Sequence, residues 1–305
     1  MLKSFYFKNV LRVRRYFFSR FFVNRTSKKS KIILILSSGR SGSTWLQSLV
    51  NHQNKFRLIF EPFNFHNSSF SFGDFSRKFF DETSTLVRHL ESVIYGEARD
   101  AWMDVYNKKF FTKNRVIKDI NSNQLLGTFY NKFPNIKILY LVRDPFEVAF
   151  SRVRLGWHKE KDLAAKTDFS SFTKQDVMKK NFKQYHLDLI EKYKDNIFLN
   201  EILFWCFDNY VSYNFYKSKA NDIKLVSYNK LRNQPEKYFE EISVFIGETV
   251  NVFKLNHLIM KPSATAAINE KNSSDIDNIN LSKEDILEAH EIINSFNLTD
   301  LFKAL

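Results

Sequence analysis

The chain has 305 residues, enough for one large α/β domain or two small ones, and its 44% hydrophobic content with only 5 prolines excludes a disordered protein. The single cysteine, Cys206, excludes an intramolecular disulfide framework and a cysteine-rich zinc site, and it favours a reducing compartment such as the cytoplasm. The formal net charge of +14 indicates an anionic partner: a phosphorylated ligand, nucleic acid, an acidic glycan or a membrane surface.

Residues 1–29 form a basic, aromatic segment, and the first acidic residue of the chain is Glu61. Lysines and arginines interrupt every apolar run of this segment, so neither a transmembrane helix nor a secretory signal is predicted. Three interpretations remain open: a segment lying on an anionic membrane, a transit-like leader, and a helix packed on the domain with a solvated basic face. We therefore divide the chain into this segment and one domain over residues 30–305.

The first strand is predicted at Ile32–Leu36, a near-continuous apolar run that ends in Ser-Ser-Gly, as buried parallel strands do. Further short apolar runs predict strands at 56–60, 116–117, 136–142 and 223–226. Helix-like stretches lie between them, at 43–52, 146–155, 201–219 and 235–246. Strands that alternate with helices predict βαβ units around a mostly parallel sheet.

Three other segments lack this alternation. Residues 64–115 are rich in Phe, Ser and charge without a clean strand, and residues 158–200 are strongly polar and lysine-rich. We interpret both as helical or loop insertions at the edge of the sheet, where acceptor-binding surfaces usually lie. Residues 261–280 are typical of a loop or flap. Ser282 is the expected N-cap of a last helix.

The loop between the first strand and the first helix is typical of an anion-binding site, because a helix N-terminus offers unpaired N–H groups and a positive dipole end. Glycines allow close approach of the backbone, hydroxyl groups add donors, and an arginine supplies a permanent charge suited to phosphate or sulfate. These residues are Ser38, Gly39, Arg40, Ser41, Gly42, Ser43, Thr44 and Trp45. A Walker A loop would need lysine where Ser43 stands. The simpler alternative is an ordinary glycine- and serine-rich turn.

Ser37–Val50 resembles the 5′-phosphosulfate loop of sulfotransferases that use 3′-phosphoadenosine 5′-phosphosulfate (PAPS), and is closest to the carbohydrate branch, where Arg precedes Ser-Gly-Ser. The resemblance implies an α/β, P-loop NTPase-like three-layer fold with a central mostly parallel sheet flanked by helices. It also implies that Arg40 contacts the bridging region of the phosphosulfate and that residues 41–44 hold the 5′-phosphate. Trp45 would lie beside the adenine, or equally be a core indole.

A second phosphate site is indicated by Arg143, which ends a predicted strand, and Ser151, eight residues later on the following helix. Two such side chains can converge on one phosphate, although Arg143 could equally be a structural ion-pair partner. The spacing resembles the 3′-phosphate site of the same family. Tyr228 lies in a third matching element, where Asn229 and Lys230 replace the acidic pair of the family, and it would face the adenine or pack at the strand end. A looser likeness places residues 261–265 over the 3′-phosphate.

Glu61 is the candidate catalytic base, because it follows the second strand in Phe-Glu-Pro, which resembles an element of carbohydrate sulfotransferases. The alternative is a carboxylate paired with Arg40 or Arg143. Arg40 and the helix N-terminus would stabilise the leaving phosphate. Lys118 would contact the donor or the transition state, or end its strand exposed. Alternative bases are His52, His66 and His158, and no cluster of metal ligands is visible in the sequence.

These patterns together predict transfer of a sulfonate from PAPS to a hydroxyl of a carbohydrate-type acceptor, a glycan or glycolipid, without a metal. The product nucleotide would be adenosine 3′,5′-bisphosphate (PAP), and nucleic acid is not expected as a partner. A P-loop-like nucleotide kinase is disfavoured by the missing lysine after Gly42. A non-catalytic basic module would explain the charge but not the spacing from Arg143 to Ser151.

Overall fold

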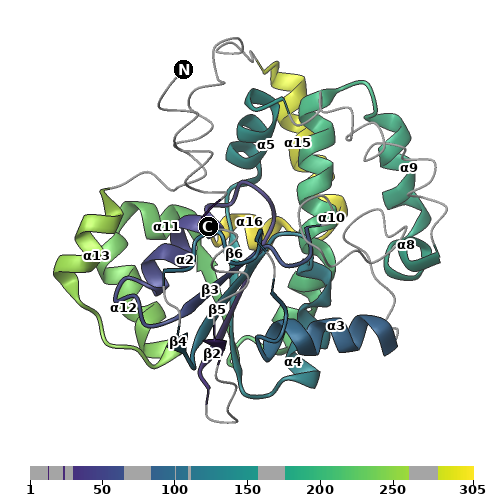
Figure 1. Cartoon of the computed structure of the whole chain (residues 1–305). Coiled ribbons are helices and arrows are strands. Elements are labelled where there is room, and N and C mark those ends of the chain that lie inside the picture. The colour runs from purple at the N-terminus through teal and green to yellow at the C-terminus, as the bar shows by residue number, and fades with distance from the viewer. Residues whose placement is uncertain are drawn as a thin grey trace.

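The computed structural model describes residues 30–64, 84–99, 101–108, 111–156, 176–260 and 281–305, together with Val13 and one short strand at 23–24. Five strands form the central sheet in the order β3-β5-β2-β6-β7, and every neighbouring pair is parallel (Figure 1). Their bounds are β2 (Ile32–Ser37), β3 (Arg57–Phe60), β5 (Arg115–Asp119), β6 (Ile136–Val142) and β7 (Ile223–Ser227). Apart from this sheet, β1 (Val23–Asn24) pairs with β4 (Phe111–Thr112).

Helices cover both faces of the sheet, which confirms the predicted three-layer α/β fold (Figure 1). One face carries α2 (Ser43–Val50), α11 (Tyr228–Asn233), α12 (Pro235–Ile246) and α13 (Val252–Ile259). The other face carries α3 (Ser84–Ile94), η1 (Asn123–Leu125), α4 (Leu126–Lys132), α5 (Pro145–Arg154), α9 (Gln184–Lys192), α10 (Ile197–Ser218), α15 (Lys283–Ser295) and α16 (Thr299–Lys303). The short helix α8 (Asp176–Asn181) precedes α9.

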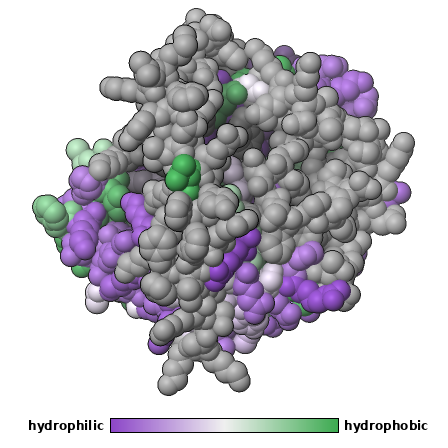
Figure 2. Space-filling view, in the orientation of Figure 1, coloured by the Kyte–Doolittle hydropathy of each residue, from purple (hydrophilic) through white to green (hydrophobic). Residues whose placement is uncertain are grey.

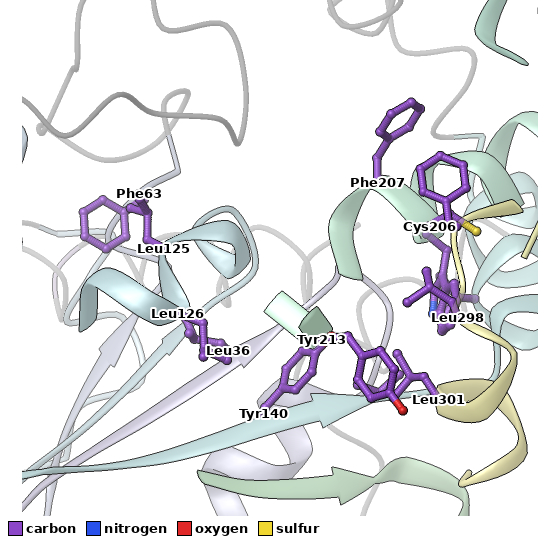
Figure 3. Packing of buried hydrophobic residues seen from close by; sticks show 14 of the residues in the cluster. Leu36, Phe63, Leu125, Leu126, Tyr140, Cys206, Phe207, Tyr213, Leu298 and Leu301 are labelled. Carbon is purple, nitrogen blue, oxygen red and sulfur yellow. The ribbon is translucent and has the colours of Figure 1, made fainter. Parts of the chain in front are cut away.

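The core has two halves because successive residues of a strand point to opposite faces. In β2, Ile32, Leu34 and Leu36 pack into one half, and Ile33 and Ile35 pack into the other. A strand buried on both faces reads as a continuous apolar run, which is why its position was predictable. Figure 3 shows the larger half, in which side chains from the sheet and from α4, α10 and α16 meet; they include Leu36, Tyr140, Leu126, Tyr213 and Leu301.

The register of the strands brings their carboxyl ends to one edge of the sheet. Leu36 lies opposite both Asp119 of β5 and Tyr140 of β6, while Phe60 lies opposite Lys118. Ligands of open parallel sheets bind outside this edge. The loop after β2 is at its centre, with β5 and β3 on one side and β6 and β7 on the other.

The predicted strands and helices are confirmed, with shifts of at most four residues at their ends; α10, for example, begins at Ile197 rather than at residue 201. The predicted N-cap Ser282 forms a capping box with Asp285. Among the described residues, the region 64–115 contains α3 and β4, and the region 158–200 contains α8, α9 and the start of α10. The late loop 261–265, His66, His158 and most of residues 1–29 lie outside the described residues.

Two surface features complete the fold. Across the described residues, no helix is long and apolar enough to span a membrane. Apolar surface shows at the left of Figure 2, over α12 and α13, whose exposed large side chains are Val244, Val252 and Phe253.

Candidate active site

The loop between β2 and α2 turns through two residues in the left-handed region, Arg40 (φ 73°) and Gly42 (φ 86°), and α2 then begins at Ser43. The amides of Trp45 and Leu46 donate to the carbonyl of Gly42, which closes the first turn. Among the residues that the structure describes, the amides of Arg40 and Gly42 donate to no carbonyl of the chain. Free N–H groups at the start of a helix form an anion site.

The hydroxyl-bearing residues of the loop are all buried: Ser38, Ser41, Ser43 and Thr44. The Oγ atoms of Ser38 and Ser41 lie 2.9 Å apart, so that one donates to the other across the turn. This bond links Ser38 to Ser41 across the turn. The other two hydroxyl groups belong to Ser43 and Thr44, the first residues of α2.

Tyr228 begins α11 directly after β7, and its ring lies against the backbone of Gly42. The ring of Trp45 meets Tyr228 edge to face, with 5.9 Å between centroids, and its Nε1 donates to the carbonyl of Leu258 at 3.4 Å. Both rings are half-buried. The structure therefore places Trp45 and Tyr228 together beside the loop, where both rings pack on the edge of the core that α2 forms with the sheet.

Arg40 extends from the loop to α5, where its Nε donates to Oγ of Ser151 at 3.1 Å. Burial lowers the pKa of Arg40, and the positive charges of Arg143, Arg154 and Arg152 lower it further. Several cations held this close together repel one another, and a bound anion would relieve that repulsion. The local electrostatics thus favour an anion between the loop and α5.

Arg143, which follows the last residue of β6, contacts both the loop and Tyr228. Its Nη1 donates to the carbonyl of Arg40 at 3.1 Å, and its guanidinium lies 4.4 Å from the centre of the Tyr228 ring. It also makes the structural ion pair that the sequence left open, with Glu147 one turn further on, where Nε and the carboxylate are 2.7 Å apart. Arg143 and Ser151 thus both contact Arg40, Arg143 at its backbone carbonyl and Ser151 at its side chain.

Two residues of this site were missed by the sequence reasoning. Glu147 accepts from Arg143 and from Asn229, and the i, i+4 spacing from Arg143 was a usable signal for it. Arg152 is buried beneath the loop and donates to the carbonyl of Gly39. No local pattern marked Arg152, because its partners come from distant parts of the chain.

Glu61 and Lys118 form a buried ion pair on the other side of the loop, at the ends of β3 and β5. The second carboxylate oxygen of Glu61 accepts from Nδ2 of Asn64 at 3.2 Å. The alternative pairing of Glu61 with Arg40 or Arg143 is therefore wrong: the positive partner is Lys118. An exposed Lys118 is also wrong, because Phe60 covers it, with Nζ 4.4 Å from the ring centre.

Aromatic side chains line the region next to this pair. The ring of Phe60 meets Trp102 and Tyr106 edge to face, at centroid distances of 5.2 Å and 4.8 Å. The Nε1 of Trp102 donates to the carbonyl of Glu61 at 3.3 Å. Glu61 has a φ of 43°, so its backbone is held in a conformation that is uncommon for a non-glycine residue.

Asp119, the residue after Lys118, is fully buried and holds the two strand ends in place. It accepts from the amide of Phe63 at 3.0 Å, from the amide of Asn121 at 2.6 Å and from the hydroxyl of Ser122 at 2.9 Å. Burial raises its pKa to about 6, against the lowering effect of these hydrogen bonds.

His52 lies at the far end of α2, away from the loop. Its Nδ1 is 2.8 Å from the carbonyl of Leu49, and its Nε2 accepts from the amide of Asn251 at 3.0 Å. One ring nitrogen therefore contacts the last turn of α2 and the other links it to the N-cap of α13, and the alternative that His52 is the catalytic base is not supported.

Asn229 and Lys230, which stand where the family has an acidic pair, have other partners here. Asn229 donates to Glu147 at 3.3 Å, and Nζ of Lys230 donates to the carbonyl of Ala304 at 2.7 Å. They tie α11 to α5 and to the end of the chain.

The carboxyl edge of the sheet thus carries two kinds of site. Cations and free amides gather over β2, β6 and β7, and a buried carboxylate–ammonium pair lies over β3 and β5. In the part of the chain that the structure describes, no group of three or more His, Cys, Asp or Glu side chains could hold a metal ion.

The family model described as sulfotransferase domain matches residues 30–292. No curated protein matches the sequence. Solved structures similar to the chain include the sulfotransferase domain of the Synechococcus PCC 7002 olefin synthase, with 14% identity, a TM-score of 0.43, and coverage of 90% of this chain and 98% of that one. The sulfotransferase STF9 of Mycobacterium avium has 8% identity, a TM-score of 0.46, and coverage of 90% and 77%. Mouse sulfotransferase SULT7A1, solved with PAP, has 12% identity, a TM-score of 0.44, and coverage of 95% and 91%.

Proposed function

Because this chain belongs to the sulfotransferase family, we propose that it transfers a sulfonate from PAPS to a hydroxyl of a carbohydrate-type acceptor, a glycan or glycolipid, and releases PAP. The observation that carries the donor half of the proposal is that Arg143 and Ser151 both contact Arg40, which lies in the loop directly before α2. PAPS has two separated phosphates, and this edge of the sheet offers two elements for them.

The loop residues 38–44 would hold the 5′-phosphosulfate, since free amides, hydroxyl groups and Arg40 converge at one helix N-terminus. Arg143 and Ser151 would hold the 3′-phosphate. Tyr228 and Trp45, two half-buried rings in edge-to-face contact, would flank the adenine. A single arginine such as Arg143 can serve the phosphate and still keep its second contact with the loop, because its guanidinium has five N–H donors.

In the proposed reaction the acceptor oxygen attacks the sulfur, its proton passes to the Glu61 carboxylate, and the bond from sulfur to the bridging oxygen breaks. The electron pair of that bond goes to the 5′-phosphate of PAP. Arg40 and the loop amides stabilise this charge without reorganisation, as preorganised donors do. Lys118 orients the Glu61 carboxylate through their ion pair, and it would bring a positive charge to the side of the loop on which the acceptor is proposed to bind.

The carbohydrate-type acceptor is supported by the Arg-Ser-Gly-Ser and Phe-Glu-Pro elements and by the aromatic lining beside Glu61. Trp102 and Tyr106 are partly exposed and offer apolar ring faces next to the proposed base, and both pack against the buried ring of Phe60. A sugar ring presents C–H groups on its faces and hydroxyl groups on its rim, and it can therefore pack on a ring while one hydroxyl reaches Glu61.

We further propose a cytoplasmic enzyme that associates peripherally with an anionic membrane through residues 1–29. The support is the basic and aromatic sequence of this segment, in which no acidic residue occurs. Deleting residues 2–22 should abolish cosedimentation with vesicles of anionic lipid, and equal sedimentation of the shortened protein would contradict this part of the proposal.

The donor is tested by thermal stabilisation. PAP should raise the melting temperature of the protein, ATP should not, and Arg143→Ala should remove the effect of PAP. Equal stabilisation by ATP would favour a nucleotide kinase. The acceptor is tested by transfer of labelled sulfonate from PAPS to a panel of glycans, glycolipids and small phenols, in which label on phenols alone would contradict the carbohydrate-type acceptor.

A further inference from the structure

Arg152 occupies an unusual position for an arginine, because its side chain is only 2% exposed and lies under the phosphate loop. Its Nε and Nη2 both donate to the carbonyl oxygen of Gly39, at 3.2 Å and 3.1 Å. A buried arginine needs partners for its charge. Here Glu201 and Asp208 of α10 supply them, with N···O distances of 3.2 Å to each carboxylate.

The two hydrogen bonds from Arg152 to the Gly39 carbonyl determine the direction of the N–H group of Arg40, which belongs to the same peptide unit. In a trans peptide the C=O and the N–H project in opposite directions. Holding the Gly39 carbonyl toward Arg152 therefore turns the Arg40 N–H to the other side, away from the buried arginine. Within the described chain this N–H donates to no carbonyl, which leaves it for a ligand.

The helix α10 also contacts Arg143, the residue proposed to bind the 3′-phosphate of the donor. Trp205, on the same face of α10 as Glu201 and Asp208, donates from Nε1 to the carbonyl of Arg143 at 3.0 Å. Residues 201, 205 and 208 are one and two helical turns apart, so they form one stripe. This stripe is buried against α5 and the loop.

We infer that Arg152, neutralised by Glu201 and Asp208, is a positioning residue that sets the Gly39–Arg40 peptide so that the loop binds the 5′-phosphate of the donor. The inference rests on the proposed function, since it concerns the same donor site. Arg152 acts through the backbone of Gly39 and is not itself assigned to the ligand. An arginine is required because one guanidinium must donate twice to one carbonyl and also meet two carboxylates.

The test separates positioning from general stability by a matched control. Arg57 is equally buried, binds Asp104 through two N–H groups and donates to the carbonyls of Gly96 and Ala98. It lies at the start of β3, at the opposite end of the strands from the loop. Arg57→Lys should therefore lower the melting temperature as Arg152→Lys does, without changing ligand affinity.

Adenosine 5′-monophosphate, adenosine 3′-monophosphate and PAP are the probes, in calorimetry or competition binding. Arg152→Lys should lower the affinity for PAP and the affinity for the 5′-monophosphate by the same factor, about tenfold, which corresponds to about 1.4 kcal/mol. It should leave the 3′-monophosphate unchanged, and KM for PAPS should rise more than kcat falls. Arg57→Lys should bind all three nucleotides as the unaltered protein does.

Several results would overturn the inference while leaving the proposed function intact: equal binding of the 5′-monophosphate by Arg152→Lys and the unaltered protein, equal losses for the two phosphate positions, or an equal loss in Arg57→Lys. Failure of the unaltered protein to bind PAP would instead overturn the proposed function. If Arg152→Lys does not fold, Asp208→Asn replaces it. That variant should weaken the 5′-monophosphate about threefold and spare the 3′-monophosphate, and unchanged binding of both would count against the inference.

Discussion

The ring of Tyr228 lies so close to Gly42 that a Cβ atom on Gly42 would be 2.4 Å from Cε2 of the tyrosine. Gly42 also has a φ of 86°, which side chains other than glycine rarely adopt. Two independent constraints therefore require glycine here. The contact joins the loop after β2 to the end of β7, and it sets the distance between the elements proposed for the 5′-phosphate and the adenine.

Gly42→Ala is expected to push the Tyr228 ring away and to strain the loop. We expect a loss of stability of about 1–2 kcal/mol from the backbone alone, and PAP affinity lowered about tenfold or more. Thermal unfolding and calorimetry measure the two effects. Gly247→Ala is the matched control, since Gly247 also has a positive φ (65°) but ends α12 away from the loop. It should lose stability without losing PAP affinity, and similar PAP affinity in both variants would refute the role of the contact.

Arg143→Ala should weaken PAP by about 100-fold, because it removes a charged partner of the 3′-phosphate and the hydrogen bond to the carbonyl of Arg40. The affinity of this variant for adenosine 5′-monophosphate should fall much less than its affinity for PAP. Arg232→Ala is the control, since Arg232 also contacts Glu147, at 3.4 Å, but is half-exposed. A larger loss in Arg232→Ala than in Arg143→Ala would move the 3′-phosphate site to α11.

Glu61→Gln should lower kcat by about 10²–10⁴-fold, because the amide cannot accept the proton of the acceptor hydroxyl. KM for PAPS should change little, since the donor elements lie on the other side of the loop. Steady-state kinetics with saturating acceptor measure both quantities. Asn64→Ala removes the neighbour of the same carboxylate and serves as the control. A kcat that is unchanged in Glu61→Gln would assign the base elsewhere.

His52→Ala should reduce stability by about 1–2 kcal/mol without lowering kcat, because His52 bonds the backbone at Leu49 and Asn251 and lies far from the loop. Denaturant unfolding and activity at a temperature well below unfolding are the measurements. A kcat that falls at least as far as in Glu61→Gln would restore His52 as a candidate base.

The pH dependence of stability should carry a contribution from Asp119, whose pKa burial raises to about 6. Between about pH 4 and pH 6 the unfolded chain ionises this carboxyl while the folded protein keeps its proton. Because the folded state then binds more protons, the free energy of unfolding falls as the pH rises, by an amount on the order of 3 kcal/mol. Asp119→Asn should lose this part of the slope in urea unfolding at several pH values. An identical slope in both proteins would contradict the raised pKa.

The sequence was sufficient for the strands, since a strand covered on both faces must be apolar throughout, as Ile32–Leu36 shows. It was also sufficient for the conformation of the loop before α2, because a glycine that can adopt a positive φ (Gly42), hydroxyl groups and a helix start are encoded within nine consecutive residues. Arg143 and Ser151 could be predicted as a pair for the same reason, since they lie eight residues apart on one strand–helix connection, and their role in phosphate binding stays a prediction.

Contacts between distant residues could not be found in this way. The pairing of Glu61 with Lys118 depends on the register of β3 with β5, and a register is set by the packing of whole strands. The hydrogen bonds from Arg152 to Gly39 require a buried arginine, and its charge is compensated by two carboxylates about 50 residues further along the chain. The sequence by itself thus determined the local element that we propose as the anion site, because backbone conformation is a short-range property. Only the tertiary structure decided which buried charges pair, because a buried charge needs an opposite one, and its partner can come from any element that the fold brings near.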